Sequence, residues 1–228
     1  MLRICRSAKA APDASTGKGG EAFRATLSEV MVQMLADAGA TGFVLSHLPP
    51  GPAPVLWLQD RLSRKEAGRP YLPGLRLPCP MLMVTPSHPR DVLIAAEDGL
   101  RCGALSAVVA EIWGDPPVLD FTTTKRLALR AEASGVACWL IRWNASARLS
   151  AARERWRIAS LPSASNPDDP AAPGDPRWRA ELFRSRTRRP GEWVVRHDRA
   201  AHRFDFVTAI PDGTLVATGG EIRQRTAR

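Results

Sequence analysis

The sequence predicts an α/β fold with a mixed, mainly parallel central sheet flanked by helices. Between His88 and Trp143 the apolar residues recur at helical spacing, then form an unbroken run, and then repeat both patterns. The unbroken runs, Leu105 to Ile112 and Val136 to Ile141, are typical of parallel strands buried on both faces. After residue 176, short apolar stretches alternate with turn residues, which indicates an antiparallel hairpin or meander.

Length and composition indicate one domain with irregular ends. The 228 residues, 44% of them hydrophobic, suit a single core of roughly 100 to 200 residues. We expect a flexible tail at 1–20, one domain at 21–210 and a second tail at 211–228. No apolar run approaches the ~20 residues of a membrane span, and no signal-peptide pattern is present. We therefore expect a cytoplasmic protein without a membrane partner.

The elements before the αβαβ unit are short. Residues 21–39 place apolar side chains at helical spacing, although the string LSEVMVQM within them also fits a strand. Val55 to Leu58 is apolar and flanked by prolines, which predicts a buried strand. Residues 61–80 are rich in Arg, Pro and Gly and predict a loop with at most one helical turn. Met81 to Thr85 predicts a further strand.

Capping residues predict where the two helices of the αβαβ unit begin and end. Pro89, directly after His88, suits a first helical turn, where its missing N–H would have no partner. Gly103 is the expected end of that helix. Asp120 is a suitable N-cap for the second helix, and Gly135 is the matching stop.

The C-terminal third alternates between strands and turns. The string from Arg153 to Ala159 predicts a strand with basic residues on one face. The proline-rich segment 161–176 predicts an exposed, mobile loop in which the pair Asp168 and Asp169 is solvated. Residues 177–207 predict basic antiparallel strands.

Positive charge is concentrated after residue 142. Lys and Arg exceed Asp and Glu by 32 − 23 = 9, which favours a polyanionic partner such as DNA, although a solvated basic surface is the alternative. Arginines bind phosphates and aromatic rings stack on bases, so interleaved Arg and Trp suit single-stranded nucleic acid or an acidic protein. Alternatively, Trp156, Trp178 and Trp193 cover a sheet beneath arginine side chains. The candidate residues for DNA or partner binding are Arg155, Arg157, Arg184, Arg186, Arg188 and Arg189.

No motif predicts catalysis. A phosphate-binding loop of the form GxxxxGK[ST] is absent, and the nearest string, residues 15–20, follows no apolar strand and lacks a hydroxyl after Lys18. Glu111 ends an apolar run, where an ATPase would hold a metal-bound water; the alternative is a helix cap or an ion pair with an arginine. The cysteines and histidines lack metal-ligand spacing. We therefore expect no catalytic residue, nucleotide site, cofactor or metal.

Several longer strings carry a family resemblance. They are LSEV with ADAGATGF, PVLWLQDRLSRKEAGRPYLPGL, SHPRDVLIAAEDGLRCGALSAVVAEIWGDPPVLDFTTTKRLALRAEASGV, and WRAELFRSRTRRPGEWVVRHD. Together they span roughly residues 27–206 and resemble the ImuA family of damage-induced mutagenesis proteins, in particular its alphaproteobacterial branch. The resemblance implies a core related to the RecA ATPase. It places Glu111 at the Walker B position and residues 31–42, MVQMLADAGATG, where the phosphate loop would lie, without its Lys.

The resemblance also implies a role in the SOS response. ImuA proteins are accessories to translesion DNA synthesis and act with ImuB, an inactive relative of the Y-family polymerases. RecA and an error-prone relative of the replicative polymerase α subunit are further candidate partners. We therefore expect a non-catalytic assembly factor that binds proteins and DNA. The alternatives are a residual RecA-type ATPase and, because the family is grouped with SulA, a cell-division inhibitor.

Overall fold

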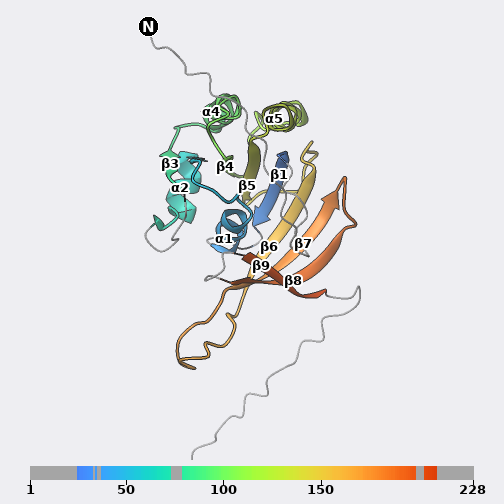
Figure 1. The fold of residues 1–228 in the computed structure, drawn as a ribbon. Helices are drawn as coiled ribbons and strands as arrows, with labels where there is room; N and C mark the ends of the chain where they lie inside the picture. The colour runs from blue at the N-terminus through green and yellow to red at the C-terminus, as the bar shows by residue number, and fades with distance from the viewer. Residues whose placement is uncertain (1–24, 33, 35–36, 73–78, 199–202, 210–228) are drawn as a thin grey trace, which may run out of the picture.

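A computed structural model describes residues 25–32, 34, 37–72, 79–198 and, for the backbone alone, 203–209. One nine-stranded sheet runs through the molecule in the order β3-β2-β4-β5-β1-β6-β7-β8-β9 (Figure 1). The parallel strands are β1 (Leu27–Val32), β2 (Val55–Gln59), β3 (Met81–Val84), β4 (Ala107–Trp113), β5 (Ala137–Trp143) and β6 (Glu154–Leu161). The antiparallel strands are β7 (Arg177–Ser185), β8 (Gly191–Asp198) and β9 (Arg203–Ala209). The predicted α/β class with a mainly parallel sheet and a C-terminal meander is confirmed.

Helices cover the two faces of the parallel strands. The helices are α1 (Gly39–Ser46), α2 (Arg61–Ala67), α4 (Pro89–Gly99) and α5 (Phe121–Ser134). On one face, Phe43 and Val44 of α1 pack with Trp57, Trp139 and Trp156. The opposite face is covered by α4 and α5, which lie side by side in Figure 1. No helix in the described part of the chain is long and apolar enough to cross a membrane.

The αβαβ unit has the predicted order of elements and most of the predicted caps. Asp120 accepts a hydrogen bond from the Thr123 N–H at 2.7 Å, and Gly135 adopts a left-handed conformation with φ of 75°. Gly103 does not end α4, which stops at Gly99. The chain leaves the helix earlier because a series of tight backbone turns already begins there, with the Cys102 N–H bonded to the Gly99 carbonyl at 2.9 Å.

Before this unit, one alternative is confirmed and one prediction is wrong. Within residues 21–39, the described string Leu27–Val32 is the strand that the sequence allowed and not a helix, because it lies between β5 and β6 and is buried on both faces. Arg61–Ala67 forms a seven-residue helix, where we expected at most one turn. The missed signal is Asp60, whose side chain accepts a hydrogen bond from the Ser63 N–H at 2.5 Å and so caps α2.

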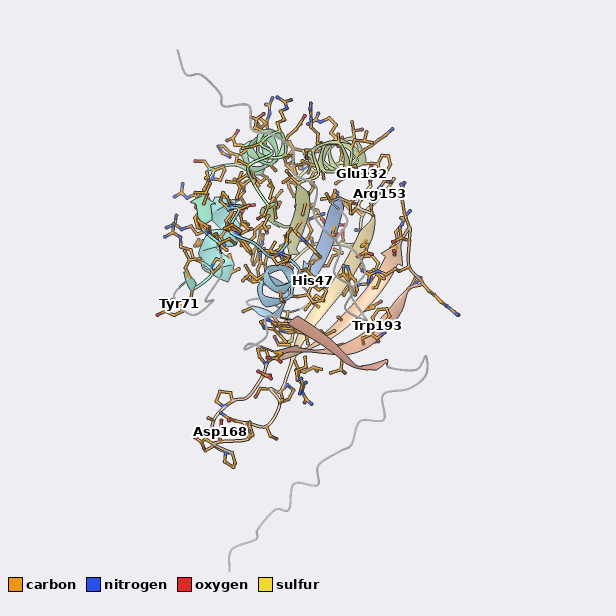
Figure 2. All side chains as sticks on the ribbon, in the orientation of Figure 1. His47, Tyr71, Glu132, Arg153, Asp168 and Trp193 are labelled. Atoms are coloured by element: carbon orange, nitrogen blue, oxygen red, sulfur yellow. The ribbon has the colours of Figure 1, made fainter. Side chains whose placement is uncertain are left out.

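The predicted proline-rich loop is an exposed connection between two strands. The connection between β6 and β7 is irregular and largely exposed, and Asp168 lies near its tip (Figure 2). One isolated bridge, between Ser165 and Pro173, joins its two sides. The predicted tails, 1–20 and 211–228, and the string 15–20 lie outside the described residues.

Candidate functional site

The carboxyl edge of the parallel strands is where α/β proteins bind ligands. Here β1 leads into α1, the position that the family resemblance assigns to a phosphate loop. The carboxylate of Asp37 accepts the Gly39 N–H at 2.8 Å and therefore already occupies the start of α1. The same carboxylate binds the Ser160 backbone N–H at 2.8 Å and the Ser160 hydroxyl at 2.5 Å. An anion at this helix start would meet a negative charge.

Close packing also restricts the space at α1. A Cβ atom on Gly42 would lie 2.8 Å from Cζ2 of Trp178, and one on Gly39 would lie 2.7 Å from Oγ of Ser160. The two glycines are therefore required by contacts with β6 and β7. Their presence at the start of α1 is explained without a bound phosphate.

Glu111 lies inside the sheet layer and is only 1% exposed. Its carboxylate accepts hydrogen bonds from the indole N–H groups of Trp57 and Trp143, the latter at 2.8 Å, and from the Gln59 amide at 3.3 Å. Among the described residues it neither caps a helix nor pairs with an arginine, contrary to the structural alternative that we considered. Both oxygens are engaged by neutral donors, so the carboxylate is not presented to a metal-bound water.

Burial controls the proton affinity of this carboxyl group. It raises the pKa of Glu111 from 4.5 to about 7, because removal from water disfavours the charged form. The hydrogen bonds from Trp143, Trp57 and Gln59 oppose the rise, and the nearby charge of Asp60 adds to it. A carboxyl with this pKa is partly protonated near neutral pH.

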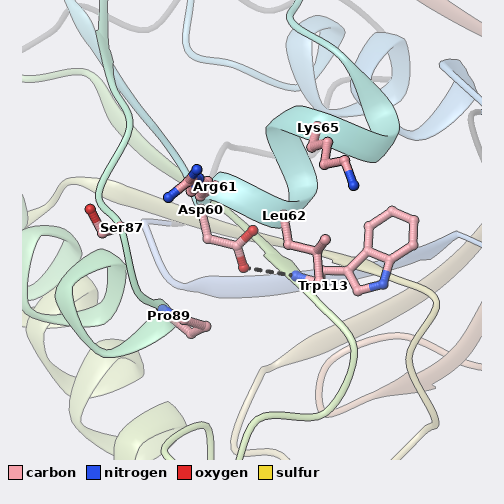
Figure 3. A pocket seen from close by; sticks show the side chains of 7 residues that line it. All are labelled: Asp60, Arg61, Leu62, Lys65, Ser87, Pro89 and Trp113. Atoms are coloured by element: carbon pink, nitrogen blue, oxygen red, sulfur yellow. Dashed lines mark hydrogen bonds between the residues drawn. The ribbon is translucent and has the colours of Figure 1, made fainter.

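A small pocket lies beside the end of β4 (Figure 3). Its volume is about 290 Å³, and it is formed by the first turns of α2, the loop before α4 and the half-buried ring of Trp113. Its lining residues are Asp60, Arg61, Leu62, Lys65, Ser87, Pro89 and Trp113. Asp60 serves the fold here, because its second oxygen accepts the Trp113 N–H at 3.1 Å while the first caps α2.

A second cleft, of about 500 Å³, opens where β1 and β5 end. Asp115 at its margin binds Arg142 at 2.6 Å and the Ser146 hydroxyl at 2.6 Å. Burial raises the pKa of Asp115, but the hydrogen bonds from Ser146 and the charges of Arg142 and Arg148 lower it by more. The pKa of Asp115 is therefore below its usual value. Among the residues that the structure describes, no three His, Cys, Asp or Glu side chains are grouped to hold a metal.

A buried ionic cluster joins three neighbouring strands. Glu29 of β1 is fully buried between Arg142 of β5, at 3.0 Å, and Arg155 of β6, at 2.5 Å. The guanidinium carbons of Arg155 and Arg157 lie 5.0 and 4.1 Å from the centre of the Phe183 ring. Arg155 is 2% exposed and is not accessible to a DNA phosphate in this structure.

Two further arginines from the predicted binding set pair within the sheet. Arg157 binds Glu181 at 2.8 Å, and Arg188 binds both oxygens of Glu154 at 2.8 and 2.7 Å. Cross-strand pairing of this kind neutralises much of the positive charge of β6 to β8. The basic strands are therefore less cationic than their sequence suggests.

The other three arginines of the predicted set are exposed to solvent. Arg184, Arg186 and Arg189 are exposed at the turn between β7 and β8. Within the described ranges, none of them forms an ion pair. This turn lies at the edge of the sheet where β6 begins, close to the Arg153–Glu132 pair labelled in Figure 2. If a phosphate binds this protein through the predicted set, these three residues are the available ones.

The tryptophans among the arginines are structural. Trp156 and Trp178 are 1% and 5% exposed and pack in the core, with Trp193 against them. The guanidinium of Arg188 lies 5.4 Å from the centre of the Trp156 ring. Of the two interpretations of the sequence, the one in which these rings cover a sheet beneath arginines fits the structure.

Comparison with known proteins gives the family. No known family profile matches the chain. Protein ImuA of Caulobacter vibrioides, in strains NA1000 / CB15N and ATCC 19089 / CIP 103742 / CB 15, is 34% identical over 177 residues. The alignment covers 72% of this chain and 69% of each relative. The chain belongs to the ImuA family. The resemblance inferred from the sequence strings is therefore confirmed.

The sequence analysis of this ImuA-family chain missed the side chains that make the main polar contacts of the candidate site. Asp37, Glu29 and the indoles around Glu111 were not among the candidates. A signal was present for Glu29 and Arg142, because each is a charged residue inside a short apolar strand, where a charge requires a buried partner. No comparable signal marks Trp57 or Trp143, which resemble ordinary core residues.

Proposed function

We propose that this protein is a non-catalytic accessory factor of SOS-induced translesion DNA synthesis. The observation that carries the proposal is its membership of the ImuA family, at 34% identity to Protein ImuA of Caulobacter vibrioides. In this role the chain binds an ImuB-like homologue of the Y-family polymerases. RecA and the error-prone polymerase α subunit are further candidate partners in the same assembly.

The geometry of the carboxyl edge supports a binding role over hydrolysis. Asp37 occupies the start of α1, and the contacts of Trp178 and Ser160 account for its glycines. Glu111, the residue at the Walker B position, is held by indole and amide donors inside the layer. ATP hydrolysis requires phosphate-binding N–H groups and a carboxylate that positions a metal or water, and both are already engaged in internal contacts.

The exposed arginines of the β7–β8 turn are the proposed DNA contact. Arg184, Arg186 and Arg189 lack ion-pair partners among the described residues, and the chain carries a net charge of +9. Phosphate contacts of exposed arginines give affinity without sequence preference. This contact would hold the assembly near DNA while the protein partners supply specificity.

Deletion of the gene tests the proposed function. We expect damage-induced mutation frequency to fall in the deletion strain and to recover when the chain is supplied in trans. Cell division should remain normal when the chain is expressed. Filamentation on expression, together with an unchanged induced mutation frequency on deletion, would instead identify a SulA-like division inhibitor.

A further inference from the structure

The strand β3 forms one end of the sheet and carries exposed apolar side chains. Leu82 and Val84 are 49% and 44% exposed, while the alternate residues Met81 and Met83 pack against the core on the α1 side. Within the described ranges, β3 pairs with β2 alone, so one side of its backbone is unpaired. Proteins usually protect such an edge with charged side chains, a bulge or a proline. None of these interrupts Met81–Val84 itself.

The apolar surface continues from β3 onto the neighbouring strand. Leu82 is in register with Leu56 of β2, which is only partly buried and packs against the buried cluster beneath α4 and α5. Because α4 packs against β2 and β4, the face of β3 that carries Leu82 and Val84 extends beyond the helix. An extended segment laid along β3 would therefore gain backbone hydrogen bonds and also bury this strip.

The basic side chains at the carboxyl end of β3 indicate what kind of segment fits this edge. Helix α2 exposes Arg61, Arg64 and Lys65, and Arg64 reaches Thr85 at the end of β3 with a 3.4 Å hydrogen bond. Its one acidic residue is Glu66. A segment that is apolar at alternate positions and acidic nearby would match both features, since strand addition takes affinity from the backbone and specificity from alternate side chains.

The same charges argue against two other occupants. A second copy would present the same basic α2 beside its own β3 and so would not supply acidic charge. Residues 1–24 and 210–228 both contain more Arg and Lys than Asp and Glu. Neither the chain's own ends nor another copy supplies the complementary charge.

We propose that the edge of β3, with Leu82 and Val84, binds an acidic, extended segment of the ImuB-like partner by strand addition. This inference rests on the proposed function for the identity of the partner. The loop after β3 contributes Ser87 to the 290 Å³ pocket that Arg61 and Trp113 also line (Figure 3).

The test measures the affinity of the purified full chain for the ImuB-like protein of the same organism. The variant Leu82→Asp with Val84→Asp should weaken binding by about tenfold or more, because it removes the apolar contacts and repels acidic residues. The matched control is Leu129→Asp, at a site on α5 that is 51% exposed, and its affinity should equal that of the wild type. Equal effects of the two substitutions would exclude β3 as the docking edge.

Two further measurements keep the result independent of folding. In the wild-type complex, the amide hydrogens of Met81–Val84 should exchange more slowly than in the free chain. Replacing Arg61 and Arg64 by Glu should weaken binding more at low salt than at high salt, because exposed charges are screened. If the wild-type chain does not bind the ImuB-like protein, the proposed function fails as well. Binding without protection of β3 would overturn only the docking inference.

Discussion

Two glutamates are buried in this sheet, and their surroundings differ in charge. Glu29 lies between two guanidinium groups on the face covered by α5, whereas Glu111 faces two indoles and an amide on the α1 face. Both carboxylates have hydrogen-bond partners, but only Glu29 has neutralising charges. A buried carboxylate with neutral donors retains a large desolvation cost, which appears as a raised pKa. One site is therefore an ionic cluster of paired charges, and the other is a carboxyl group whose burial raises its pKa.

The strongest way to test this difference is to remove the charge of Glu29. Glu29→Ala should lower the free energy of unfolding by about 3–5 kcal/mol, because Arg142 and Arg155 would remain buried without their shared partner. Urea unfolding measures the decrease. Glu66→Ala, on the exposed surface of α2, is the control and should change stability by less than about 0.5 kcal/mol. A small effect at Glu29 would mean that water reaches the cluster.

The pH dependence of stability should report the raised pKa of Glu111. Glu111 has a pKa of about 7 in the folded protein and 4.5 ordinarily, so the folded state binds its proton more tightly than the unfolded chain. The resulting stabilisation is fully present below pH 4.5 and is lost as pH rises to about 7, a change on the order of 3 kcal/mol.

The variant Glu111→Gln isolates this contribution because an amide does not titrate. Its stability at low pH should be somewhat below that of the wild type, since the amide accepts fewer hydrogen bonds from the indoles. The difference between the two proteins should shrink or reverse between pH 4.5 and 7. Parallel stability profiles for both proteins would show that the pKa of Glu111 is the same in the folded and unfolded states, contrary to this prediction.

The three exposed arginines of the β7–β8 turn, unlike the buried Arg142 and Arg155, are available to bind DNA phosphates. Replacing Arg184, Arg186 and Arg189 together by Ala should reduce the salt dependence of single-stranded DNA binding, by about 0.7 in the log–log slope for each phosphate that is no longer neutralised. Filter binding at several salt concentrations gives the slope. An unchanged slope would place the DNA-binding surface elsewhere or exclude it. The control is Arg148→Ala, which removes an exposed arginine that lies 3.5 Å from Asp115, near the carboxyl ends of β4 and β5. The slope of this variant should equal that of the wild type.

Substituting an exposed arginine of the β7–β8 turn should have the smallest effect on the free energy of unfolding. Arg186→Ala should change the free energy of unfolding by no more than about 0.5 kcal/mol. Arg155→Ala, by contrast, leaves Glu29 buried with one partner fewer and should cost several times more. Thermal unfolding of the two variants compares them directly. Equal melting temperatures would contradict the assignment of Arg155 to the folded core.

The predictable parts of the molecule are those determined by local pattern. The αβαβ unit and the meander follow from changes in apolar period, and Asp120 and Gly135 follow from capping chemistry. Charged residues inside apolar strands signalled that Glu29 and Arg142 need buried partners, but the partners themselves could not be predicted, because Glu29 lies 113 residues from Arg142 and 126 from Arg155. They meet only because β1 is inserted between β5 and β6. The candidate arginines likewise looked equivalent in sequence, and strand register alone separates the paired ones from Arg184, Arg186 and Arg189.

Glu111, which the family resemblance places at the Walker B position, has both carboxylate oxygens engaged by Trp57, Trp143 and Gln59, and we propose that it serves the fold and not a reaction. The most direct test is the damage-induced mutation frequency of a deletion strain that expresses Glu111→Gln at the wild-type protein level. We predict the same frequency as with the wild-type chain. A frequency as low as that of the deletion strain, with the variant folded and present at normal level, would contradict the claim and restore a chemical role for Glu111.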